Sequence, residues 1–219
     1  MPGRPFLTVV PLELSERYDM TTRRQLLLAG GAAGLALALA GHPALAADAA
    51  TAFIDDLGGR AIAVLADKSL SEQQRETDFR DLFLLAFDVS AIGQFVLGRY
   101  RRTATPEQIE EFNRLYTVDV VKTYSRRLSQ YAGEQLQTLG SEVLEGETLV
   151  RSQIVSPKGG APVQVGWRLT GTPGNYKIVD VVIENLSMRS AQREDFGSVI
   201  SNGGMDALLA GLKKKNGIS

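Results

Sequence analysis

The stretch VQVGWRLTGTPGNYKIVDVVIENL, residues 163–186, decides the fold class of this 219-residue chain. Each of its two halves alternates apolar and polar side chains, which is the period of a half-buried β-strand. Residues 172–175 between the halves are typical of a turn. Because so short a connection joins antiparallel strands, the stretch predicts a β-hairpin whose apolar face needs a cover.

Two further strands precede this hairpin. Side chains also alternate over residues 135–145 and 148–156, and a Gly-rich turn at residues 157–160 leads into the third strand. With the last strand at about residues 176–186, the four strands predict an antiparallel meander. Helical patterns lie before and after them, an order typical of an α+β domain with helices on one face of the sheet.

Capping residues mark where two of the helices begin. Ser71 is followed three residues later by Gln74, the spacing of a capping box, and Thr105 is followed by Pro106 and then Gln108. The second of these helices has an unusually aromatic stripe of Ile109, Phe112, Tyr116, Val120, Tyr124, Leu128 and Tyr131.

Glycines interrupt the other helical patterns. Gly58 and Gly59 lie within a pattern over residues 49–68 and indicate a bend or close packing, and Gly98 ends a short apolar helix over residues 88–98. Residues 202–204 separate two C-terminal helices, which we expect at residues 187–200 and 205–215.

The first 46 residues have the pattern of an export signal. Arg23 and Arg24 precede an apolar run over residues 26–40, and Ala44-Leu45-Ala46 is an A-x-A cleavage site. The run is too short for a typical membrane anchor, and the arginine pair favours the twin-arginine route over the Sec route. Met20 stands where such a signal would begin, so residues 1–19 are read as an upstream extension. We expect one mature domain, residues 47–219, outside the cytoplasm.

Composition excludes several kinds of chemistry for this mature domain. The chain has no cysteine, and its one histidine, His42, lies before the cleavage site. Disulfides and cysteine nucleophiles are therefore excluded, and the commonest general base and transition-metal ligand is missing. Four of the 24 basic and three of the 25 acidic residues precede residue 47, which leaves a net charge near −2. We expect no metal, no cofactor and no nucleic acid partner.

Two polar features are candidates for chemistry. Asp180 lies inside an apolar strand, where it is either a general base or an exposed or turn-bonded aspartate. The arginines at 99, 101, 102, 126 and 127 either grip a phosphate bidentately or form a solvated cluster.

An ordered series of motifs adds a resemblance that periodicity does not show. The motifs are Phe87-Asp88, FVLGRY at residues 95–100, TATPEQ at 103–108, WRL at 167–169, YKIVDV at 176–181 and LSM at 186–188. With Phe112, Tyr124, Tyr131 and the closing helices over residues 196–212, they resemble the MlaC family, also called toluene-tolerance proteins. Two departures are Arg101, where the family often has an aromatic residue, and Glu184-Asn185, where it has Glu-Gly.

The resemblance implies a periplasmic carrier of a diacyl phospholipid. It implies a cone-shaped sheet of the nuclear-transport-factor type and a helical subdomain, which together enclose an apolar cavity for the acyl tails. It also implies that an outer-membrane lipoprotein complex supplies the lipid and that an inner-membrane ABC transporter with an MCE-domain protein accepts it, which keeps the outer membrane asymmetric. Because each buried CH₂ is worth about 0.8 kcal/mol, a lipid needs such a shielded cavity to cross water.

As residues lining this cavity we expect Phe87, Phe95, Leu97, Tyr100, Phe112, Tyr116, Tyr124, Val165, Trp167, Val181 and Ile183. The carrier hypothesis needs no catalytic residue. Two alternatives stay open: a small cone-fold enzyme that uses Asp180 on a hydrophobic substrate, and a periplasmic adaptor that carries nothing. The identity of the lipid, glycerophospholipid or hopanoid, and the direction of transfer also stay open.

Overall fold

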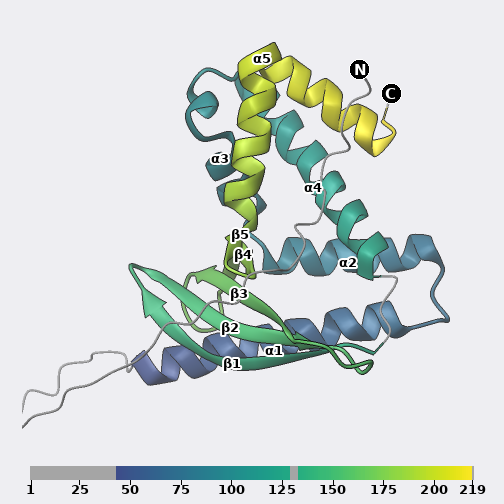
Figure 1. The fold of residues 1–219 in the computed structure, drawn as a ribbon. Helices are drawn as coiled ribbons and strands as arrows, with labels where there is room; N and C mark the ends of the chain where they lie inside the picture. The colour runs from purple at the N-terminus through teal and green to yellow at the C-terminus, as the bar shows by residue number, and fades with distance from the viewer. Residues whose placement is uncertain (1–42, 129–132, 219) are drawn as a thin grey trace, which may run out of the picture. The chain divides into compact units, whose positions relative to one another are not determined.

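The computed structural model describes residues 43–128 and 133–218. Helices α1 (Pro43–Ala66), α2 (Glu72–Ala86), α3 (Val89–Leu97), the 3₁₀ helix η1 (Gly98–Arg102) and α4 (Pro106–Leu128) precede the sheet, and α5 (Met188–Asn216) follows it (Figure 1). The expected signal, up to residue 42, and Tyr131 lie outside the described residues. Within these two ranges, no helix has the length and apolar character needed to cross a membrane.

The sheet is an antiparallel meander in which every strand pairs with its neighbour in sequence. It comprises β1 (Gln135–Leu144), β2 (Glu147–Val155), β3 (Val163–Thr170), β4 (Lys177–Ile183) and β5 (Leu186–Ser187), in that spatial order. This confirms the α+β class and the four long strands predicted from sequence.

The short strand β5 corrects the expected strand count. Sequence patterning continued the fourth strand to Leu186, whereas Glu184 and Asn185 both have a positive φ and reverse the chain. Leu186 and Ser187 therefore pair back onto Ile183 and Val182. A strand of two residues is too short to show an alternating period.

The predicted helix caps are confirmed by their hydrogen bonds. Ser71 Oγ accepts from Gln74 N at 3.1 Å, and Thr105 and Gln108 exchange reciprocal bonds of 3.0 and 3.2 Å. The two predicted C-terminal helices are both present within α5, where a kink separates them at Gly204, whose backbone angles are non-helical.

Helix α1 packs along β1, and its glycines explain how closely it does so (Figure 1). A Cβ at Gly58 would lie 2.6 Å from Leu136 Cδ2, whereas a Cβ at Gly59 would meet open space. Ser141 Oγ of β1 also donates to Ala47 O of α1 at 2.6 Å. Gly58 therefore serves close packing, whereas Gly59 does not.

Buried apolar side chains form two separate clusters. The helix cluster joins α2, α3, α4 and α5 and includes Leu97, Phe112 and Leu115. The sheet cluster joins α1 to the inner strands and includes Ile54 and Ile178. Phe87 packs against both clusters and forms a bridge with Ile178 of β4, so the two clusters meet where α2 ends.

Candidate functional site

A cavity of about 560 Å³ lies between the helix cluster and the sheet cluster. Its wall is predominantly apolar and comes from helices α1 to α4, the first turns of α5 and strands β1 to β4. Seven of the residues expected from sequence line it: Phe87, Tyr116, Tyr124, Val165, Trp167, Val181 and Ile183.

Strands β3 and β4 build one wall through cross-strand pairs. Val165 lies opposite Ile183, and Trp167 lies opposite Val181, so all four side chains share one face of the sheet. Trp167 Nε1 donates to Ser152 Oγ at 2.9 Å, and this buried hydroxyl in turn donates to Val165 O at 3.0 Å. Because the indole N–H is satisfied within the sheet, Trp167 offers the cavity apolar ring surface.

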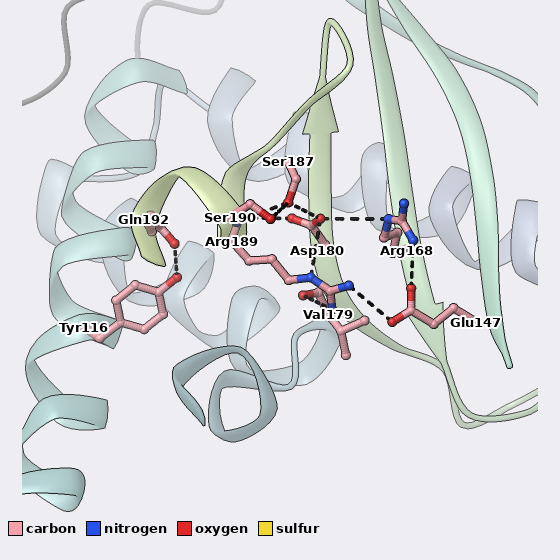
Figure 2. A network of polar contacts seen from close by, with 9 residues as sticks. All are labelled: Tyr116, Glu147, Arg168, Val179, Asp180, Ser187, Arg189, Ser190 and Gln192. Carbon is pink, nitrogen blue, oxygen red and sulfur yellow. Dashed lines mark hydrogen bonds and ion pairs between the residues drawn. The ribbon is translucent and has the colours of Figure 1, made fainter. Parts of the chain in front are cut away.

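Tyr116 of α4 contributes a polar group on the opposite wall. Its hydroxyl donates to Gln192 Oε1 of α5 at 2.6 Å, and both residues line the cavity (Figure 2). Burial, first of all, raises the pKa of the Tyr116 hydroxyl well above its usual value of 10. Tyr116 therefore stays protonated and acts as a hydrogen-bond donor that fixes α4 against α5.

A network of two carboxylates and two guanidinium groups borders the same region (Figure 2). Asp180 of β4 accepts from Ser187 Oγ at 2.6 Å and from the Arg189 backbone N–H at 3.1 Å. Arg189 Nε lies 3.5 Å from Asp180, and Glu147 of β2 contacts both Arg189, at 3.4 Å, and Arg168, at 3.1 Å. The two negative charges balance the two positive charges, so the network has no net charge. It connects the start of α5 to strands β2, β3 and β4.

These contacts favour the turn-bonded interpretation of Asp180 over the general-base interpretation. The side chain is only 1% exposed, and both of its oxygens already accept hydrogen bonds. A register shift opposite Arg168 and Leu169 makes β4 irregular here, so that Ile178, Val179 and Asp180 are all buried. The simple alternation expected for this strand is therefore wrong at these three positions.

The other expected lining residues lie elsewhere. Phe95, Leu97 and Tyr100 line a second pocket of about 590 Å³ between the α3–η1 segment and α5. Phe112 is fully buried in the helix cluster, one turn before Tyr116, and its ring stacks on Tyr116 with a centroid distance of 5.5 Å. The α4 stripe therefore faces the core at Phe112 and reaches the cavity at Tyr116, Val120 and Tyr124.

Sequence reasoning missed several parts of the cavity wall, of which α1 and the start of α5 are two. Helix α1 contributes Ile54, Leu57, Ala61 and Ile62, and the first turns of α5 contribute Met188, Arg189 and Gln192. The helical period of α1 was visible in the sequence, but a period does not tell which partner the apolar face meets. The polar side chains of α5 carried no signal of a cavity at all.

No group of three or more acidic, histidine or cysteine side chains in residues 43–128 and 133–218 is placed to hold a metal ion.

Comparisons with known proteins agree with this architecture. A solved structure from Ralstonia solanacearum, described as a phospholipid-binding protein in complex with a phospholipid, superposes with a TM-score of 0.65. It is 22% identical in sequence and covers 78% of this chain and 97% of its own. At this identity the likeness shows the fold.

Two curated proteins are similar in sequence. The intermembrane phospholipid transport system binding protein MlaC of Haemophilus influenzae is 24% identical over 126 residues, which are 56% of this chain and 59% of that protein's length. The toluene tolerance protein ttg2D of Pseudomonas putida is 23% identical over 181 residues, which are 79% of this chain and 84% of that protein. The family model described as MlaC protein matches residues 56–214, and the chain therefore belongs to the MlaC family.

Proposed function

We propose that this protein binds a diacyl phospholipid in the cavity and carries it through the periplasm between the outer membrane and an inner-membrane ABC transporter. The observation that carries the proposal is the apolar cavity of about 560 Å³ between two separately packed clusters. Such a wall, built from aromatic and branched aliphatic side chains, suits acyl chains and offers few groups that could react with them.

Energetics support enclosure of the tails. Each CH₂ removed from water contributes about 0.8 kcal/mol, so an acyl chain strongly favours the cavity over the aqueous space between two membranes. Methylene groups discriminate poorly between pockets, so selection among lipids rests on the shape of the cavity and on the few polar groups at its border. Tyr116 and Gln192, which are bonded to one another, are two of these groups.

The relatives support the same proposal through what is known of them. The relative from Haemophilus influenzae is described as the binding protein of an intermembrane phospholipid transport system. The relative from Ralstonia solanacearum was solved in complex with a phospholipid. The proposal has four further parts. It includes a periplasmic location, an outer-membrane lipoprotein complex that supplies the lipid, an inner-membrane transporter with an MCE-domain protein that accepts it, and a role in outer-membrane asymmetry. We also propose that Phe87, Tyr116, Tyr124, Val165, Trp167, Val181 and Ile183 contact the lipid.

The decisive experiment identifies what the purified protein contains. We expect the full chain, exported by its own signal and purified without detergent, to yield about one diacyl lipid per protein in an organic extract analysed by mass spectrometry. A lipid-free protein with native circular dichroism would contradict the proposal and would favour the adaptor hypothesis.

Variants of the cavity wall locate the lipid. Val165→Glu places a carboxylate against the acyl chains and Val181→Phe fills part of the cavity, so both should lower the bound lipid severalfold or more. Val163→Glu is the matched control, because Val163 lies on the same strand, is 38% exposed and does not line the cavity. Unchanged lipid content in both wall variants would show that the lipid lies elsewhere.

A further inference from the structure

The second pocket is lined by two arginines, Arg99 and Arg193. We call it the arginine pocket and define it by Phe95, Gly98, Arg99, Tyr100, Ser190 and Arg193. Within the described residues, neither Arg99 nor Arg193 forms an ion pair, although Glu194 also borders the pocket. Arg189, one turn earlier in α5, contrasts with them because it is paired with both Asp180 and Glu147.

Arg193 lies against an aromatic ring and close to a glycine. Its guanidinium lies over the Phe95 ring, 5.3 Å from the centroid. Gly98 has a φ of 54°, and a Cβ there would lie 2.9 Å from Arg193 Nε. Only glycine suits this backbone angle and leaves room for the guanidinium, so α3 ends in a way that accommodates Arg193.

Arg99 is fixed by its neighbour in sequence. Arg99 Nη2 donates to Tyr100 Oη at 2.9 Å, and the guanidinium lies 4.9 Å from the centroid of the Tyr100 ring. Two exposed guanidinium groups thus border one pocket, and each has further N–H donors for an anion. Arg101 and Arg102 follow on η1 and add positive charge outside the pocket.

The arginine pocket adjoins the apolar cavity across Phe95. Arg189 lines the cavity and lies 4.5 Å from the centroid of the Phe95 ring, the same ring that supports Arg193. Residues 189 and 192 of α5 line the cavity, whereas residues 190 and 193 line the arginine pocket, so the two spaces occupy neighbouring faces of one helix. An amphiphile with its tails in the cavity would have its charged group near this helix.

We propose that the arginine pocket binds a phosphate ester through Arg99 and Arg193. Planar guanidinium groups recognise phosphate oxygens bidentately, and the hydroxyl of Ser190 can add a donor from α5. Two sources supply this chemistry: the phosphodiester of a lipid held in the cavity, and free phosphate. Assigning it to the lipid head group rests on the proposed function, whereas the anion site itself does not.

The first arm of the test measures lipid retention. Full-length exported protein is incubated with phosphatidylcholine vesicles that contain a labelled tracer, either phosphatidylglycerol or diacylglycerol with the same acyl chains, and is then re-isolated. The double variant Arg99→Gln/Arg193→Gln should retain at least roughly tenfold less phosphatidylglycerol than wild type, because charge-assisted hydrogen bonds are lost, and should retain diacylglycerol unchanged. Arg101→Gln/Arg102→Gln removes the same charge outside the pocket and should match wild type.

The second arm titrates inorganic phosphate into ¹⁵N-labelled protein and follows the arginine Nε signals by NMR. A saturable shift of Arg99 and Arg193 that loading with phosphatidylglycerol abolishes identifies the lipid head group as the ligand. A shift that persists in the loaded protein, with phosphatidylglycerol retention unaffected in the variant, identifies free phosphate. Arg193→Lys keeps the positive charge but loses the planar guanidinium that can bind phosphate through two N–H groups. This variant should therefore show a weaker phosphate-induced shift at Arg99.

The absence of any saturable shift, together with equal phosphatidylglycerol retention in the two double variants, would overturn the arginine pocket as an anion site. Failure of wild type to retain either tracer would count against the proposed carrier function, and the phosphate titration would still test the pocket. Lipid retention by wild type therefore tests the carrier function, and the phosphate titration tests the anion site separately.

Discussion

Asp180 shows how much of this structure depends on a single side chain. It is buried, it caps the start of α5 through the Arg189 N–H, and it neutralises Arg189 and part of the charge of Arg168. Removing its charge leaves Glu147 alone to balance the two guanidinium groups of this network, and breaking a buried ion pair in this way is strongly destabilising.

We therefore expect Asp180→Asn to lower the free energy of unfolding by about 3–5 kcal/mol, measured by urea denaturation at neutral pH. Asp195→Asn, an exposed position of the same helix, is the control and should change it by less than about 0.5 kcal/mol. A variant at position 180 as stable as wild type would mean that the ion-pair network contributes nothing to the fold.

The structure places the expected strand residues at the cavity more consistently than the expected helix residues. Val165, Trp167, Val181 and Ile183 line the cavity as expected because a strand has two faces and alternation separates them. Phe112 and Tyr116 belong to one continuous stripe, yet only Tyr116 reaches the cavity. A stripe wide enough to pack against several partners does not show where core packing ends and a cavity begins.

The pairing of α1 with β1 gives a prediction at the scale of the element. Gly58 and Gly59 are neighbours in one helix, but only Gly58 faces Leu136. Gly59→Ala should raise the free energy of unfolding by about 0.5–1 kcal/mol, because alanine has the higher helix propensity and meets no obstacle. Gly58→Ala should gain less or lose stability, because the new Cβ would approach Leu136 Cδ2 to 2.6 Å.

Thermal denaturation of the two single variants, compared with wild type, checks this expectation. Equal stabilisation by both substitutions would show that Leu136 moves aside without cost and that α1 is not tightly seated on β1.

A charge cluster that joins α4 to the last turns of α5 makes stability depend on acidity. Glu111 accepts two hydrogen bonds from Arg114, at 2.7 and 2.9 Å, and Lys213 lies 3.2 Å away. These groups, Arg114 first and Lys213 next, lower the pKa of Glu111 from 4.5 to about 2. A carboxylate with a lowered pKa stabilises the folded state above its unfolded pKa, and the contribution disappears as the pH falls toward the folded pKa.

We expect Glu111→Gln to be less stable than wild type at neutral pH, with a difference that narrows between pH 4.5 and about 2. Urea midpoints measured across this range provide the check, and added salt should shrink the difference. Glu110→Gln, at an exposed position on the same helix, should track wild type. A constant difference at every pH would contradict the role assigned to the Glu111 cluster.

Elements with explicit local signals were predictable, and those defined by distant contacts were not. Ser71 and Thr105 predicted where their helices begin, because a helix cap is a contact between residues three positions apart. Leu186 and Ser187 gave no comparable sign of β5, since their pairing depends on the reversal at Glu184 and Asn185. Arg193 was missed as a pocket residue because its partners, Phe95 and Gly98, lie far away in sequence.

At the scale of the whole molecule, the helix cluster and the sheet cluster share the walls of one cavity. A lipid that binds only the folded state should therefore stabilise the entire domain, by about 2.7 kcal/mol when free lipid is at a hundred times its dissociation constant. Chemical denaturation of loaded and delipidated protein measures this difference. The Val165→Glu variant should show little difference, and identical midpoints for loaded and delipidated wild type would contradict coupling between cargo and fold.

The order of the sheet has a consequence for folding kinetics. Each strand of the meander pairs with its neighbour in sequence, so the sheet assembles from hairpins that form in about 1–10 μs. The seating of α1 on β1 is different, because the bond between Ser141 and Ala47 joins residues 94 positions apart. We expect the closure of so long a loop to occur late in folding and to be the rate-limiting step. A rearranged chain in which α1 is moved to a position directly before β1 is expected to reach the native state faster.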